Sequence, residues 1–220
     1  MITPLYVFDL DETLLDGDST MIWNEFLVEK GLACEQTFVE EDKRLMALYS
    51  QGNLGMEEYL EFAMQPLVNK TTQQVTELVE ECVQEKVLSR IFPQALDLIA
   101  SLKAQGHPMI IVSATVSFIV DVVARHLAIS NSIGIELVEE SGRYTAKILG
   151  TPSYQEGKAV RLKEWMQLQN QPFNQLHFYT DSINDLPMCE YADQAYLVNP
   201  CEQLKPYAEP KQWQVLSWNR

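Results

Sequence analysis

The fold of this chain is decided by residues 5–13, which read LYVFDLDET. Four apolar or aromatic residues in a row predict a strand that is covered on both faces, as in a parallel sheet. The strand runs directly into Asp9 and Asp11, and Thr13 follows two residues later. In an open α/β sheet, ligands bind outside the carboxyl ends of the strands, so we expect these acids at a binding site.

Size and charge limit the classes of function. The chain has 220 residues, enough for one core with a smaller lobe. Its formal net charge of −15 disfavours binding to nucleic acid and to anionic membranes. No apolar stretch approaches the ~18 residues of a membrane span, and no basic segment typical of a signal peptide begins the sequence. The four cysteines form no C-x-x-C pair. We therefore expect a cytoplasmic protein with neither a nucleic-acid nor a membrane partner.

Helical periodicity dominates the sequence between residues 16 and 88, where no convincing strand occurs. Asp18 or Ser19 is expected to cap the first helix of this region. Further helices are expected around residues 38–48, 56–67 and 72–83. An all-α insertion of ~70 residues is large enough to fold as a small lobe.

After Pro93 the pattern alternates between strands and helices, which predicts a parallel sheet with right-handed crossovers. A hairpin is expected over residues 134–149, with its turn at Ser141 and Gly142. The expected strands cover residues 109–112, 176–179, 195–198 and 213–216, and the expected helices cover 94–104, 118–127, 155–168 and a segment from about 184. The predicted domains are an α/β core of residues 1–15 and 89–220 and a helical cap of residues 16–88.

Polar side chains also follow two later strands. Ser113 follows the strand after Pro93, and Asp181 follows the next parallel strand, with Asp185 four residues on. Lys158 lies early in the helix between them. Because strand ends of a parallel sheet share one rim, we expect these side chains to meet Asp9 there.

This set of side chains suits phosphate chemistry with a metal. Mg²⁺ prefers oxygen ligands and keeps several waters, so one or two carboxylates suffice. A carboxylate can attack phosphorus and form an aspartyl-phosphate, and a neighbouring acid can protonate the leaving oxygen. Taken singly, the acids and Ser113 can be caps and Lys158 can be a surface lysine. Their order and their positions at strand ends favour a phosphate and Mg²⁺ site.

The combination resembles the haloacid dehalogenase superfamily, specifically its phosphatase branch. The family's motif D-x-D-x-[TV] appears at residues 9–13, its Ser or Thr after a strand is Ser113, and its motif lysine matches Lys158. The stretch DSINDLP, residues 181–187, is similar to the phosphoserine-phosphatase-like subgroup, which includes histidinol phosphatases. The resemblance covers essentially the whole chain. It implies a Rossmann-like three-layer α/β core with a type 1 helical cap inserted after the first strand.

The resemblance also implies a role for each motif residue. Asp9 would be the nucleophile, and Asp11 would be the general acid and base. Ser113 and Lys158 would hold the phosphoryl oxygens, with Lys158 also screening Asp9 from them. The implied Mg²⁺ site comprises Asp9, the backbone carbonyl of Asp11, Asp181 and, at the rim or behind the ligands, Asp185.

The cap indicates which substrate to expect. Phosphoserine phosphatases of this subgroup typically carry a Glu nine residues after the nucleophile and an Arg in the cap. Here that position is Asp18, and residues 56–63, MEEYLEFA, contain no Arg, although Lys43 or Arg44 could substitute. An acidic cap suits a substrate that carries an amine and no carboxylate. We therefore expect Asp18 to bind the amine of an amino-alcohol phosphate such as histidinol phosphate.

The leading hypothesis is a Mg²⁺-dependent phosphomonoesterase that acts on a small phosphorylated metabolite. Three alternatives stay open: a phosphoserine phosphatase, a phosphotransferase that uses the same aspartyl-phosphate, and a non-enzymatic regulatory binding protein. Release of phosphate without an acceptor would argue against the phosphotransferase. A binding protein would be expected to lack some of the catalytic groups, and none is missing from this sequence.

Overall fold

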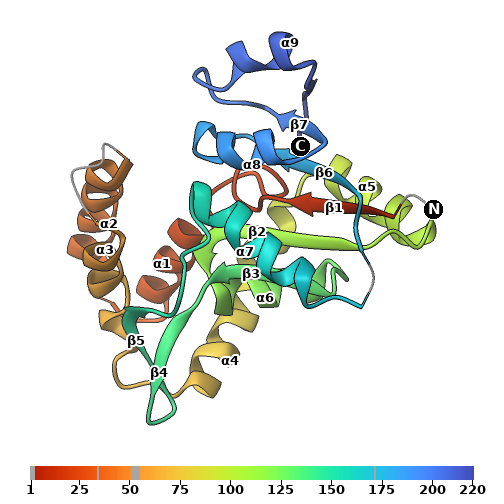
Figure 1. The fold of residues 1–220 in the computed structure, drawn as a ribbon. Helices are drawn as coiled ribbons and strands as arrows, with labels where there is room; N and C mark the ends of the chain where they lie inside the picture. Colours follow the sequence, from red (N-terminus) through yellow and green to blue (C-terminus); the bar gives the residue numbers. More distant parts are fainter. Residues whose placement is uncertain (1–2, 34, 51–54, 171) are drawn as a thin grey trace.

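A parallel sheet forms the centre of the molecule (Figure 1). The computed structural model describes residues 3–33, 35–50, 55–170 and 172–220. Within them, six strands follow the order β3-β2-β1-β6-β7-β8, and every neighbouring pair is parallel. The strands are β1 (Pro4–Phe8), β2 (Met109–Val116), β3 (Asn131–Ile135), β6 (Gln175–Thr180), β7 (Gln194–Val198) and β8 (Gln214–Leu216). The strand that opens the sequence is therefore central, as its apolar run predicts.

Alternate side chains of β1 pack into two different cores, one on each face of the sheet. Leu5 and Val7 lie in a cluster with residues of two helices, and Phe8 lies in the cluster on the other face. The first face is covered by α7 (Glu156–Gln167) and α8 (Leu186–Tyr191), the second by α5 (Pro93–Ala104) and α6 (Ser117–His126). The predicted three-layer α/β architecture is confirmed.

A helical insertion follows β1, as predicted, and stands at the carboxyl end of that strand (Figure 1). Asp18 caps its first helix by accepting a hydrogen bond from Met21 N at 2.8 Å. Trp23 packs edge-on against Phe118 of α6, so the insertion shares a core with the α/β part. The insertion comprises α1 (Ser19–Glu29), α2 (Glu35–Ser50), α3 (Met56–Ala63), the 3₁₀ turn η1 (Gln65–Leu67), α4 (Thr72–Cys82), the π-helical turn η2 (Val83–Val87) and the 3₁₀ turn η3 (Leu88–Arg90).

The segment after α6 differs from the sequence-based expectation. A hairpin of β4 (Leu137–Glu140) and β5 (Arg143–Ile148) does turn at Ser141 and Gly142, but it is shorter than predicted. Residues 131–135 form β3, an edge strand of the main sheet that periodicity missed. Gly134 explains the difference, because a glycine in a short run predicts a turn and not a strand. Here it permits close packing instead, since a Cβ at this position would lie 2.7 Å from Ser117 Cα. The remaining short elements are η4 (Ile183–Asp185), η5 (Lys205–Tyr207) and α9 (Ala208–Lys211).

None of the helices in the described part of the chain has the length and apolar character needed to span a bilayer.

Candidate active site

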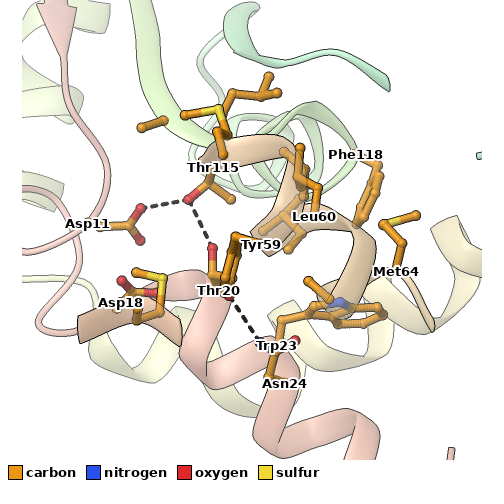
Figure 2. A pocket seen from close by; sticks show the side chains of 17 residues that line it. Asp11, Asp18, Thr20, Trp23, Asn24, Tyr59, Leu60, Met64, Thr115 and Phe118 are labelled. Carbon is orange, nitrogen blue, oxygen red and sulfur yellow. Dashed lines mark hydrogen bonds between the residues drawn. The ribbon is translucent and has the colours of Figure 1, made fainter. Parts of the chain in front are cut away.

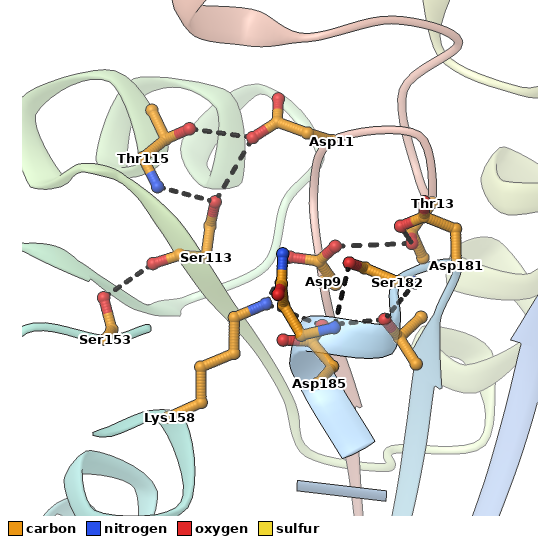
Figure 3. Close-up of polar contacts among 12 residues, drawn as sticks. Asp9, Asp11, Thr13, Ser113, Thr115, Ser153, Lys158, Asp181, Ser182 and Asp185 are labelled. Atoms are coloured by element: carbon orange, nitrogen blue, oxygen red, sulfur yellow. Dashed lines mark hydrogen bonds and ion pairs between the residues drawn. The ribbon is translucent and has the colours of Figure 1, made fainter. Parts of the chain in front are cut away.

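The carboxyl ends of three adjacent strands bring the predicted side chains to one place (Figure 3). Asp9 directly follows β1, and its backbone N–H donates to Tyr179 O of β6 at 2.9 Å. Asp181 directly follows β6. Ser113 lies inside β2, which continues to Val116, so the alternative that it merely caps the next helix is wrong.

Lys158 is buried at the centre of this group. Its Nζ lies 2.7 Å from Asp9 Oδ1 and 2.7 Å from Asp185 Oδ2, and only 3% of the residue is exposed. The alternative of a surface lysine is therefore wrong. The start of α7 fits tightly at this point, because a Cβ on Gly157 would lie 1.9 Å from Pro152 O. Glycine at this position lets α7 approach closely enough to place the ammonium.

Asp11 faces the start of the helical insertion. Its Oδ1 accepts a hydrogen bond from Ser19 N at 2.6 Å, in the first turn of α1, where the helix dipole favours an anion. Its Oδ2 accepts from Thr115 Oγ1 at 2.8 Å and, more weakly, from Ser113 Oγ at 3.5 Å (Figure 3). The carboxylate is thus held in place by groups from both the insertion and β2.

Asp9 and Asp181 lie next to each other with a single hydroxyl between them. Thr13 Oγ1 lies 3.5 Å from Asp9 Oδ2 and 3.2 Å from Asp181 Oδ1, and its one proton can serve only one carboxylate at a time. Burial raises the pKa of Asp181 to about 7, and the nearby Asp185 carboxylate adds to that rise. Burial likewise raises the pKa of Asp9, although Lys158 opposes the shift. The pair carries more negative charge than its surroundings neutralise.

These oxygen donors fit a hard divalent cation. The described residues contain no ready-made cluster of three His, Cys, Asp or Glu ligands, but Mg²⁺ needs only one or two carboxylates because it keeps several waters. Among the described side chains, the Thr13 hydroxyl is the one hydrogen-bond donor that lies between Asp9 Oδ2 and Asp181 Oδ1. A cation between them would offset the burial penalty, and the smaller repulsion from neighbouring carboxylates, that raise both pKa values. Asp185 instead contacts Lys158 and Thr180, so its predicted place at the metal stays a prediction.

Three further residues, which no sequence motif indicated, support the site. Thr115 binds Asp11, Ser153 Oγ donates to Ser113 O at 2.6 Å, and Thr180 Oγ1 donates to Asp185 Oδ2 at 2.7 Å. Thr115 could have been found, because residues two apart on a strand point to the same side. Ser153 lies in a loop with no periodic signal.

A cavity of about 130 Å³ opens beside Asp11, between the insertion and β2 (Figure 2). Its polar side chains come from Asp11, Asp18, Thr20, Asn24 and Thr115. Its apolar wall comprises Trp23, Met46, Met56, Tyr59, Leu60, Ala63, Met64, Ala114, Val116, Phe118, Ile119 and Ile135. Among the described residues that line it there is no lysine, arginine or histidine.

The charged residues of the insertion that were expected to set the charge of the substrate cavity mostly face solvent. Lys43 and Arg44 are exposed, and Arg44 binds Glu41 at 2.6 Å on the surface, so neither lines the cavity. The acids of α3 are also exposed and do not line it. Asp18 is the acid of the insertion that does, and burial raises its pKa to about 7, with Asp11 adding to the shift.

Comparisons with known proteins agree with this arrangement. The family model for haloacid dehalogenase-like hydrolases matches residues 6–190. A histidinol-phosphatase of Neisseria meningitidis is 33% identical over 218 residues, covering 97% of this chain and 98% of the relative. A phosphoserine phosphatase of Mycobacterium tuberculosis is 24% identical over 223 residues, covering 97% of this chain and 70% of the relative.

Solved structures show the same fold. A protein of unknown function from Bordetella pertussis superposes with a TM-score of 0.90 at 32% identity and covers 98% of this chain and 99% of its own. A phospho-aspartyl intermediate analogue of phosphoserine phosphatase superposes with a TM-score of 0.67 at 18% identity, over 100% of this chain and 95% of its own. The chain therefore belongs to the haloacid dehalogenase-like hydrolases and, within them, to the phosphatases of the phosphoserine-phosphatase and histidinol-phosphatase-like subfamily.

Proposed function

We propose that this phosphatase is a Mg²⁺-dependent phosphomonoesterase that works through an aspartyl-phosphate on Asp9 and prefers an amino-alcohol phosphate such as histidinol phosphate. The observation that carries the mechanism is the buried contact of Lys158 with Asp9, beside a second strand-end acid, Asp181. Together these groups can bring a phosphate dianion and a carboxylate nucleophile into one site despite their repulsion.

The first half of the reaction transfers the phosphoryl group to the protein. A carboxylate oxygen of Asp9 attacks phosphorus, the new O–P bond forms, and the bond from phosphorus to the substrate oxygen breaks. Asp11 donates a proton to the departing alkoxide, so the alcohol leaves neutral. Lys158 and Ser113 hold the phosphoryl oxygens. Mg²⁺, when bound by Asp9, Asp181 and the backbone carbonyl of Asp11, supplies neutralising charge to the phosphoryl group.

The second half regenerates the protein. Asp11, now a carboxylate, takes a proton from a water as that water attacks the phosphorus, and the bond from Asp9 to phosphorus breaks. Inorganic phosphate leaves, and Asp11 is protonated again for the next cycle. The hydrogen bonds from Ser19 N and Thr115 Oγ1 keep its carboxyl in one orientation through both steps.

The substrate preference rests on the cavity beside Asp11. Its described lining carries an acid, Asp18, and no cationic side chain that could meet a substrate carboxylate. Its aromatic walls from Trp23, Tyr59 and Phe118 suit a ring or an aliphatic body. The relative that is 33% identical is a histidinol-phosphatase, which supports the same substrate class. Phosphoserine is the alternative substrate, since other relatives are phosphoserine phosphatases.

Phosphate release from purified protein tests both parts of the proposal. We expect a higher kcat/KM for histidinol phosphate than for phosphoserine on the same preparation, because that ratio reports discrimination between competing substrates. We also expect phosphate release without any added acceptor alcohol, which distinguishes a hydrolase from a phosphotransferase. A higher kcat/KM for phosphoserine would overturn the substrate preference, and no turnover of any phosphomonoester would overturn the enzymatic assignment.

A further inference from the structure

Asn24 of α1 is buried in the wall of the cavity and has one polar atom without a partner. Only 1% of the residue is exposed, yet Asn24 Oδ1 has no hydrogen-bond donor within the described structure. Its Nδ2 donates to Asp42 Oδ1 at 2.9 Å and to Tyr59 Oη at 3.4 Å. Native proteins rarely leave a buried acceptor unpaired, so an orphan in a cavity wall points to a missing ligand.

The orientation of this amide is fixed by its neighbours. Burial and the nearby Asp42 carboxylate raise the pKa of Tyr59, so the phenol keeps its proton and donates it to Asp42 Oδ1 at 2.8 Å. Tyr59 Oη and Asp42 can then only accept from Asn24. A flipped amide would place Asn24 Oδ1 against the carboxylate and against a hydroxyl whose proton is already used. The free edge of Asn24 is therefore an acceptor.

Asp42 of α2 adds negative charge behind this acceptor. It is only 2% exposed, and no lysine, arginine or histidine among the described residues forms an ion pair with it. Its neighbours on α2, Lys43 and Arg44, point to solvent. Among the described residues this buried acid is held by a tyrosine and an amide alone, which favours a cation or a polarised N–H group in the adjacent cavity.

We propose that Asn24 Oδ1 is the specificity contact for a nitrogen of the substrate, accepting a hydrogen bond from its ammonium or N–H group, and that Asp42 positions Asn24 for this contact. The inference rests on the proposed phosphatase function and assigns the substrate its second anchor. The phosphoryl group binds at Asp9, and the nitrogen binds where Asn24 and Tyr59 line the same cavity (Figure 2). A substrate without an ammonium or N–H group leaves the Asn24 acceptor unpaired.

Two substrates separate this role from a structural one. The measured quantity is the ratio of kcat/KM for histidinol phosphate to kcat/KM for 4-nitrophenyl phosphate, which carries no N–H group. Asn24→Leu keeps the side-chain shape and removes the acceptor, and the ratio should fall about tenfold or more, as for loss of a hydrogen bond to a charged group. The loss should appear mainly in KM, because the contact lies away from the reacting phosphorus.

Asp42→Asn tests the positioning role without altering the cavity lining. An amide at position 42 can donate to Asn24 Oδ1, which lets the Asn24 side chain turn over and present its NH₂ group to the substrate. The ratio should again fall several-fold, while the thermal unfolding midpoint confirms that the variant is folded. Asn131→Leu on β3 is the matched control, because that amide contacts only Met109 O at 3.5 Å, outside the cavity, and the ratio should not change.

The outcomes distinguish this contact from the proposed function. If wild-type protein prefers histidinol phosphate and the ratio is unchanged in both Asn24→Leu and Asp42→Asn, the Asn24 contact is overturned while the proposed function stands. If both substrates lose activity equally in these variants, the role is structural and the contact is again overturned. If wild-type protein hydrolyses 4-nitrophenyl phosphate with no preference for the amine, both the amine preference and this contact fail, and the phosphatase assignment survives.

Discussion

The ammonium of Lys158 lies 2.7 Å from Asp9 Oδ1, and both side chains are buried. Burial opposes charge on Lys158, but the carboxylates of Asp185 and Asp9 raise the pKa of its ammonium above the ordinary value, so it stays charged. One cation is therefore built into the site before any metal or substrate arrives. It holds the proposed nucleophile and faces the place where a phosphoryl group would bind.

Replacing Lys158 by Ala should abolish most activity and also destabilise the fold. Removing one partner of a buried ion pair costs about 3–5 kcal/mol, and here it leaves two carboxylates, Asp9 and Asp185, without their cation. The loss should be smaller at pH 5 than at pH 8, since the pKa of Asp9 is raised by burial and protonation relieves its charge. Thermal unfolding at the two pH values measures this.

The control is Lys163→Ala on the same helix, where the side chain is exposed and lies over the Tyr191 ring. Its effect on the free energy of unfolding should stay within about 0.5 kcal/mol, as is usual for surface positions. Equal, small effects of the two variants on stability and rate would contradict the role given to Lys158.

Asp9→Asn and Asp11→Asn should fail at different steps. Asp9→Asn removes the nucleophile, so no phosphoryl-protein should form. Asp11→Asn keeps the nucleophile but lacks the general acid and base, and turnover should drop at least ~10²-fold. Rapid acid quench followed by mass spectrometry locates any acyl-phosphate. A phosphoryl group trapped on a residue other than Asp9 would rule out the mechanism.

Removal of divalent metal should stop phosphate release, and added Mg²⁺ should restore it. Mg²⁺ should also raise the thermal unfolding midpoint of wild-type protein, because a ligand that binds only the folded state stabilises it. Asp181→Asn should lose this shift, because it removes one of the two carboxylates that share Thr13. Asp121→Asn, an exposed acid of α6, should retain it. Full phosphatase activity in the presence of chelator would show that Asp9 and Asp181 do not bind a metal that the reaction needs.

Local sequence signals predict the residues at the strand ends of this molecule. An apolar run that stops at an acid marks both the strand and the site, so Asp9 and Asp181 could be placed at one rim without coordinates. Strand β3 was missed because Gly134 interrupts a run of only five residues and reads as a turn, whereas it permits close packing on Ser117.

The cavity could not be predicted in the same way. Asp42 stands between Glu41 and Lys43, so its sequence context is that of a solvated helix face. Asn24 stands beside Glu25 in a stretch of α1 that is otherwise apolar, so its sequence context does not single it out. Only the packing of α1, α2 and α3 brings Asn24, Asp42 and Tyr59 within hydrogen-bonding distance of one another. Contacts between helices far apart in sequence leave no periodic signal.

The charge on Asp18 should depend on pH, and this residue both caps α1 and lines the cavity. Burial raises its pKa to about 7 in the folded protein, with Asp11 adding to the shift. Because the folded pKa lies above the unfolded one, the fold favours the protonated acid. That contribution to stability is complete below the unfolded pKa, near 4, and is lost as the pH rises through about 7.

Above pH 7, therefore, Asp18 is ionised at some cost to stability and becomes the better partner for an ammonium group. The kcat/KM of wild-type protein for histidinol phosphate, divided by that of Asp18→Asn, should be near one at pH 6 and rise about fivefold by pH 8.5, the difference between a neutral and a charged hydrogen bond. Titration of the substrate is common to both proteins and cancels. Asn is as good a helix cap as Asp, so Asp18→Asn should keep its stability, whereas Asp18→Ala should lose about 1 kcal/mol. A flat ratio across this pH range would mean that Asp18 is only the cap of α1 and does not meet the substrate.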